Sequence, residues 1–142
     1  MSKITLPLLM LSLTLLTGCI DRTAADEKLA RGCAAGAKIF LDEGFEIKEI
    51  TGKKFRDAPS LGKGYREVTL NAIESDGWYD GETTYQCIFI ETVGLFNTNH
   101  QATIYQLRLS DDEIYGKEGD KLLGTFDDHL KLTETVEQGM NR

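Results

Sequence analysis

The feature that most constrains this chain is a series of three segments in which apolar and polar residues alternate. They are residues 65–74, 83–95 and 101–109. In the middle segment, Tyr85 and Cys87 fall on the same face, as every second residue of a strand does. Short polar turns separate the segments. Long strands joined by short turns are typical of an antiparallel meander, so we expect these segments to pair in sequence order.

A helix is predicted before the strands. Residues 27–43 carry apolar side chains at the 3.6-residue period. Asp26 is the expected N-terminal cap, and Gly44 is the expected C-terminal stop. Gly32 and Gly36 lower helix propensity, so we interpret them as points where the helix closely approaches the sheet.

The remaining sequence predicts shorter elements. Residues 45–50 indicate a short strand, and 53–64 indicate a basic loop with Lys, Arg, Pro and Gly. A second helix is predicted over 127–138, where Thr125 and Asp128 resemble a capping box. The expected class is α+β. We predict an N-terminal helix packed on a curved antiparallel sheet of about four strands, followed by a short C-terminal helix.

Composition limits the function. The chain has 142 residues and a formal net charge of −7. This length indicates one domain and leaves no room for a two-domain cofactor enzyme, so no cofactor is expected. The acidic balance argues against a general nucleic-acid binder, which needs a basic surface to displace counterions from phosphates.

The N-terminus has the pattern of a secretory signal. Lys3 is the only charged residue before Asp21, and a mostly apolar run covers residues 4–16. This run is shorter than the roughly 20 apolar residues that a membrane-spanning helix needs. It ends at Leu16-Thr17-Gly18-Cys19. This sequence resembles the lipobox of bacterial lipoprotein precursors. A short membrane anchor or a buried helix is the alternative interpretation.

The resemblance implies cleavage before Cys19 and attachment of a diacylglycerol thioether to its sulfur, with acyl chains such as palmitate forming the anchor. Ile20, rather than Asp, follows this cysteine, which implies sorting to the outer membrane, facing the periplasm. The expected organisation is a signal peptide over 1–18, a lipidated tether over 19–26 and one periplasmic domain over 27–142.

If Cys19 carries lipid, two cysteines are left for the domain, Cys33 and Cys87. Disulfides persist in exported proteins, so we predict a Cys33–Cys87 bridge worth about 4 kcal/mol in the chain-entropy model. Two buried free thiols are the alternative. A metal pair is disfavoured because no His lies near either cysteine at ligand spacing.

The sequence indicates no catalytic constellation. We interpret His100 as a solvated turn residue and His129 as a packed or boundary residue of the last helix, and neither has a nucleophile at a recognisable spacing. Acidic residues of the 75–82 turn do not match a calcium-loop spacing, so no metal site is expected. The prediction is a non-enzyme.

Two segments are candidate partner-binding sites. Trp78-Tyr79 lies in a glycine-flanked turn, where large aromatic residues often contribute most of the binding energy. The alternative is that Trp78 folds back to close the end of the sheet. The second candidate is the basic loop, which contributes Lys53, Lys54, Arg56 and Lys63. A solvated loop without a partner is its alternative.

These observations predict a membrane-anchored, non-enzymatic envelope lipoprotein. Its partner is expected to be an envelope protein or a glycan, with the domain acting as an assembly subunit, an inhibitor or an exclusion factor. A carrier of small apolar ligands is the alternative, with a cavity lined by Phe and Ile between helix and sheet. A carboxylate-based hydrolase is the third hypothesis.

Overall fold

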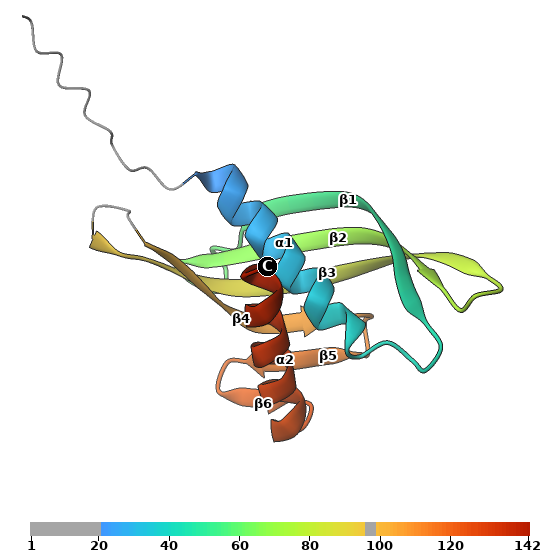
Figure 1. The fold of residues 1–142 in the computed structure, drawn as a ribbon. Coiled ribbons are helices and arrows are strands. Elements are labelled where there is room, and N and C mark those ends of the chain that lie inside the picture. The colour runs from blue at the N-terminus through green and yellow to red at the C-terminus, as the bar shows by residue number, and fades with distance from the viewer. Residues whose placement is uncertain (1–20, 96–98) are drawn as a thin grey trace, which may run out of the picture.

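In the computed structural model, which describes residues 21–95 and 99–142, six antiparallel strands form one sheet and two helices cover one of its faces (Figure 1). Each strand pairs with the next along the chain, so the sheet order is β1-β2-β3-β4-β5-β6. The elements, in chain order, are α1 Arg22–Lys38, β1 Glu46–Asp57, β2 Tyr65–Ser75, β3 Asp80–Val93, β4 His100–Arg108, β5 Ile114–Glu118, β6 Lys121–Leu123 and α2 Phe126–Met140.

Alternation along the central strands separates a buried face from a helix-free face. Val68 of β2 pairs with Cys87 of β3, and both point toward the helices and are fully buried. Their neighbours Glu67 and Gln86 point to the opposite face. The meander predicted from the three alternating segments is therefore confirmed. The core consists mainly of residues from α1, α2 and the three strands β2, β3 and β4.

The predicted disulfide is confirmed. Cys33 of α1 is bonded to Cys87 of β3, with an S–S distance of 2.05 Å. Both cysteines are completely buried within the core cluster. The bridge therefore joins the first helix to the centre of the sheet, between residues that are 54 positions apart in the chain.

The expected fold is otherwise wrong. We predicted an α+β fold with an N-terminal helix on about four strands and a short C-terminal helix. The structure is mostly sheet, with six strands, and α1 packs more extensively against α2 than against any strand. The two additional strands, β5 and β6, contain five and three residues. The sequence indicates residues 114–115 and 121–123 only as short extended pieces, because such short segments carry too little alternation to be assigned to the sheet.

The first helix begins and ends earlier than predicted. Asp21, not Asp26, is the N-cap, and its carboxylate accepts hydrogen bonds from the backbone of Thr23 and Ala24 at 3.1 and 3.3 Å. Asp26 lies inside the helix and pairs with Arg66 of β2 at 2.7 Å. The helix ends at Lys38, so Gly44 is not its cap.

Small residues set the distance between the two helices. A β-carbon added at Gly32 would lie 2.6 Å from the side chain of Met140, and one added at Gly36 would lie 2.7 Å from that of Val136. The interpretation of these glycines as contacts with the sheet is wrong, since their close neighbours belong mainly to α2. On the other side, a β-carbon at Gly139 would lie 2.6 Å from Cβ of Ala35.

The second helix follows its predicted start signal. Thr125 and Asp128 form a reciprocal capping box in which each side chain accepts a hydrogen bond from the other's backbone N–H, at 3.1 and 2.9 Å. The helix has 15 residues, so it is not short. Leu132 and Val136 are buried against the core, whereas Phe126 remains exposed.

The first strand is twice as long as predicted. We expected a strand over 45–50 that stops at Thr51-Gly52, but β1 continues to Asp57. Its pairing with β2 shifts register between Ile50 and Gly52, so the strand passes through this irregularity instead of ending. Residues 53–57 are consequently part of the sheet, and the prediction of a basic loop over 53–64 is wrong for them.

The molecule has two distinct ends along the long strands. Arg22, the first residue of α1, contacts Glu91 near the end of β3, whereas the β2–β3 turn lies at the beginning of β3. Asp80 and Glu91 are eleven positions apart, which corresponds to about 36 Å at the usual strand rise. Figure 1 shows the β2–β3 turn projecting at the end opposite the start of α1.

The predicted signal peptide, the lipobox and Cys19 lie outside the described residues, as does part of the turn, at 97–99, that we expect between the segments 83–95 and 101–109. Within the described ranges, neither helix has the length and apolar character needed to cross a membrane.

Candidate functional site

The turn between β2 and β3 is held by its own backbone and by Asp76. One carboxylate oxygen of Asp76 accepts hydrogen bonds from the backbone N–H groups of Trp78 and Tyr79, at 2.8 and 2.7 Å. The N–H of Asp76 donates to the carbonyl of Tyr79 at 3.3 Å. Gly77 adopts a φ of +90°, which favours glycine. Local hydrogen bonds therefore hold the turn conformation.

This turn exposes both aromatic side chains. Trp78 is 98% exposed and Tyr79 is 73% exposed, and they are adjacent in the chain. The structure thus excludes the alternative in which Trp78 folds back to close the end of the sheet. Burying a large aromatic side chain in a partner gives a large gain in binding free energy, because much apolar surface is removed from water.

Three acidic residues lie close to the aromatic pair in the chain, and a lysine from β1 offsets one of them. Hydrogen bonds from the Tyr79 and Trp78 N–H groups hold the pKa of Asp76 below its ordinary value. The ammonium of Lys48 in β1 bonds to Asp80, which similarly lowers the pKa of that carboxyl. Glu82 is also exposed two residues further along β3. At neutral pH the tip therefore carries ionised carboxylates beside two exposed rings.

The four basic candidates do not form one surface. Lys53 points to the helix side of β1 and pairs with Glu27 of α1 at 2.6 Å. Arg56 points to the helix-free face and pairs with Glu67 of β2. Lys54 lies on that same face, while Lys63 is exposed in the loop that follows β1. The basic sequence cluster is separated because alternation along β1 sends consecutive residues to opposite faces.

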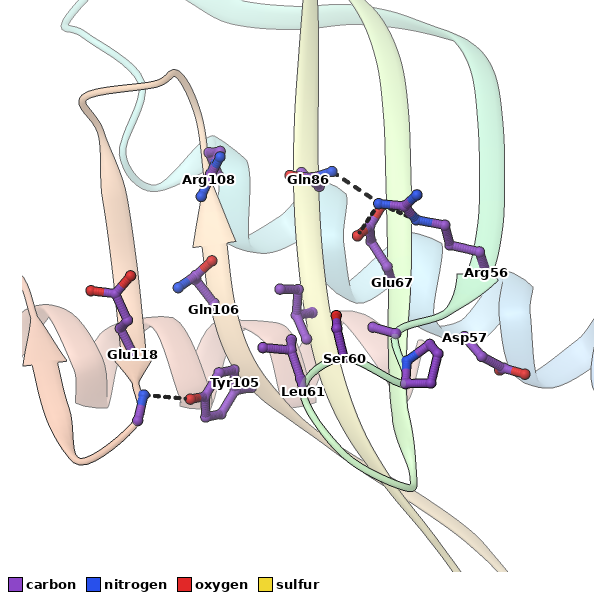
Figure 2. A pocket seen from close by; sticks show the side chains of 14 residues that line it. Arg56, Asp57, Ser60, Leu61, Glu67, Gln86, Tyr105, Gln106, Arg108 and Glu118 are labelled. Atoms are coloured by element: carbon purple, nitrogen blue, oxygen red, sulfur yellow. Dashed lines mark hydrogen bonds and ion pairs between the residues drawn. The ribbon is translucent and has the colours of Figure 1, made fainter.

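A polar cleft lies on the helix-free face, and of its polar side chains the sequence indicated only Arg56 as a candidate. It has a volume of about 560 Å³. Figure 2 shows its floor formed by β2, β3 and β4, with the helices behind the sheet. The polar side chains that line it are Arg56, Asp57, Ser60, Glu67, Gln86, Tyr105, Gln106, Arg108 and Glu118.

Pairing across the strands brings these polar groups together. Gln86 of β3 stands opposite Arg108 of β4, and Gln106 stands opposite Ile88. The strand alternation already placed Gln86, Gln106 and Arg108 away from the buried face. The register shift between Ile88 and Phe89, however, carries no sequence signal, so the combination was not predictable.

Of the two histidines, His100 differs from its expected environment and His129 does not. His100 is not a solvated turn residue. It lies in β4 with its side chain 10% exposed, and its Nε2 is 2.6 Å from Glu91. Glu91 also accepts two hydrogen bonds from Arg22, at 3.0 and 2.7 Å. His129 is half-buried on α2, in agreement with its expected boundary position. The contacts of Glu91 with Arg22 and His100 join the start of α1 to the sheet.

Within residues 21–95 and 99–142, no group of three or more His, Cys, Asp or Glu side chains is arranged to hold a metal ion. No family model, curated protein sequence or solved structure gives a significant match to this chain.

Proposed function

We propose that this chain is a lipid-anchored, non-enzymatic envelope protein that binds a protein partner through the Trp78-Tyr79 turn. The observation that carries the proposal is the 98% exposure of Trp78 on a turn fixed by hydrogen bonds. A tryptophan in water gains free energy when a partner buries it, and tryptophan and tyrosine dominate the binding energy of many interfaces.

The fixed turn favours binding over a merely exposed loop. Asp76 already holds both aromatic residues by their backbone N–H groups, so little backbone freedom is lost when a partner engages them. The two rings are rigid and have few rotatable bonds. This tip therefore offers apolar area at low entropic cost, as expected for a residue pair that inserts into a pocket.

The charge around the turn favours a protein partner whose apolar pocket is bordered by basic side chains. Asp76, Asp80 and Glu82 lie near the rings in the chain, Lys48 offsets only Asp80, and the chain as a whole has a net charge of −7. Anionic headgroups would be repelled by these carboxylates, whereas lysine and arginine side chains around an apolar pocket would complement them. A protein partner therefore fits this tip better than an acidic glycan or a lipid surface.

The position of the turn is consistent with an anchor at Cys19. The chain enters the domain at Arg22, and the aromatic tip lies at the far end of β3, about 36 Å along the strand. A domain tethered through acyl chains at Cys19 would present the tip away from its own membrane. From the outer membrane, the tip would face partners in the periplasm. An assembly subunit, an inhibitor and an exclusion factor all use such a surface.

The test compares two pairs of exposed apolar residues. In the first variant, Trp78→Ala is combined with Tyr79→Ala; in the matched control, Phe126→Ala is combined with Leu130→Ala, two exposed residues of α2. Each protein is crosslinked in intact cells and its adducts are identified by mass spectrometry. We expect the turn variant alone to lose one specific protein adduct while keeping the wild-type melting temperature.

Equal adduct yields in both variants would contradict the proposal, as would a loss that accompanies unfolding of the turn variant. The anchor is tested separately. Metabolic labelling with an alkyne fatty acid should label the wild-type chain and not Cys19→Ser. Label retained in Cys19→Ser, or recovery of the labelled protein in inner-membrane fractions, would contradict the assigned anchor or its location, respectively.

A further inference from the structure

The cleft on the helix-free face contains two charged side chains, Arg108 and Glu118, that form no ion pair or hydrogen bond with any residue in 21–95 or 99–142. Both line the cleft, and Figure 2 shows Gln106 below Arg108 and beside Glu118. Neither belongs to the aromatic turn.

The other charged side chains of the cleft already have partners within the protein. Glu67 accepts two hydrogen bonds from Arg56, both at 2.8 Å, and a third from the amide of Gln86 at 3.1 Å. Asp57 pairs with Arg66 at 2.9 Å. Arg66 also pairs with Asp26, so it is shared between two carboxylates. Arg108 and Glu118 are therefore the charged side chains of the cleft that have no partner among the described residues.

The surroundings of Arg108 suit a carboxylate. Its cross-strand neighbours are Gln86 on one side and Ile114 on the other, so no acidic residue faces it across the sheet. Its Nε is buried and has no hydrogen-bond partner. A guanidinium binds a carboxylate through two parallel hydrogen bonds, and an uncompensated one beside neutral amides is an open position for such a group.

The distance between the two charges indicates the size of the ligand. Arg108 stands opposite Ile114, and Glu118 lies four residues further along β5. Four residues of strand correspond to about 13 Å, so the two backbone positions are about this far apart along the sheet. An extended peptide of about three residues has a similar length and carries a charge at each end, so it matches this spacing better than a free amino acid does. A cleft of about 560 Å³ is also within the usual range for such a ligand.

We propose that this cleft binds a short zwitterionic peptide, with its C-terminal carboxylate at Arg108 and its amino group at Glu118. The side chains between them fit a peptide backbone. Gln106 donates its amide N–H to the carbonyl of Lys117 at 3.0 Å, which leaves its own carbonyl oxygen as an acceptor for a peptide N–H. Leu61, from the loop after β1, forms an apolar part of the wall.

The test titrates the full ¹⁵N-labelled chain, purified in detergent, with three probes of one length. They are trialanine, trialanine amide, which lacks the carboxylate, and N-acetyl-trialanine, which lacks the positive charge. We expect saturable amide shifts in β3, β4 and β5 with trialanine, and at least tenfold weaker binding for each of the other two. This comparison uses the wild-type protein, so it does not depend on whether a variant folds.

The variants then assign the two ends. The Arg108→Gln variant should bind trialanine at least tenfold more weakly than the wild type does. It should also bind trialanine and trialanine amide with equal affinity. Glu118→Gln should remove only the preference for the free amino group. Lys131→Gln, which removes one positive charge from the helix side of the protein, is the matched control and should bind trialanine like the wild type.

Three results would overturn the inference. They are the absence of saturable shifts with trialanine, equal binding of the three probes, and a loss in Lys131→Gln as large as that in Arg108→Gln. Because the cleft and the aromatic turn share no residue, each of these results leaves the proposed partner site untouched.

Discussion

The contact between the two helices makes a sharp prediction at Gly139. This residue lies in α2, where a new β-carbon would be 2.6 Å from Cβ of Ala35, 3.2 Å from the carbonyl oxygen of Arg31 and 3.3 Å from Cα of Gly32. All three atoms belong to α1 and are part of its backbone or directly attached to it. They cannot rotate away, so a methyl group at Gly139 must push the helices apart.

Two opposing contributions decide whether Gly139→Ala raises or lowers the free energy of unfolding. Alanine is better than glycine in a helix by about 1 kcal/mol. Overpacking a filled contact costs about 1–3 kcal/mol, and we take about 2 because the neighbouring atoms are rigid. The expected net result is a loss of about 1 kcal/mol in the free energy of unfolding, although the same substitution at an exposed helical position would stabilise the protein.

A second substitution separates the clash from propensity. Ala35→Gly removes the methyl group that Gly139→Ala would meet, at a propensity cost of about 1 kcal/mol. In the double variant the two propensity terms cancel and the clash with Cβ is relieved. We therefore expect stability close to wild type, and a favourable coupling of about 2 kcal/mol in the double-mutant cycle.

The assay is urea unfolding followed by far-UV circular dichroism, because the fully exposed Trp78 reports poorly on burial. Glu137→Ala, on the exposed side of α2, serves as a control that should leave the unfolding midpoint unchanged. If Gly139→Ala is neutral or stabilising, or if the cycle shows no coupling, the account of the helix contact is refuted.

The remaining predictions concern the disulfide and the turn. Combining Cys33→Ser with Cys87→Ser should lower the free energy of unfolding by about 4 kcal/mol, measured by the same urea assay; an unchanged midpoint would show that the bridge contributes nothing. The lowered pKa of Asp76 means that its hydrogen bonds to Trp78 and Tyr79 are fully present above the ordinary carboxyl pKa of 3.8 and are lost as the pH falls through the lowered value. The amide shifts of both residues should therefore be constant from pH 5 to 8 and change only below 3.8, and Asp76→Asn, which keeps an acceptor but does not titrate, should abolish that change. A transition near neutral pH would contradict this assignment.

The parts of the fold that the sequence predicted were those with a long local pattern. The central strands carry enough alternation to reveal both their existence and their order, and Thr125 with Asp128 marks the start of α2 through side chains three residues apart. The Cys33–Cys87 bridge followed from the small number of cysteines. Each of these features can be recognised from residues that are close in the chain or, for the disulfide, from the number of cysteines.

The errors arose where distant residues decide the structure. A glycine in a helix indicates that another element approaches closely, but it does not indicate which one. We therefore interpreted Gly32 as a contact with the sheet, whereas its close neighbours belong to α2. Gly52 reads as a strand end, but pairing with β2 carries β1 through it. The cleft side chains, such as Gln86 and Arg108, come together only through the register of β3 and β4.

The candidate site was predicted in part for the same reason. Trp78 and Tyr79 stand out because large aromatic residues are unusual in a turn, and their exposure depends on hydrogen bonds within that turn. The basic residues lay close together in sequence, but alternation along β1 sends Lys53 and Arg56 to opposite faces of the sheet.

The most direct test of the proposed partner site is site-specific photocrosslinking in intact cells. A photoreactive phenylalanine derivative replaces Trp78 in one protein and the exposed Phe126 in another. The account predicts a discrete adduct with one protein species from position 78 and none of that species from position 126. Adducts with lipid alone, or the same adducts from both positions, would contradict the claim that the aromatic turn is a protein-binding site.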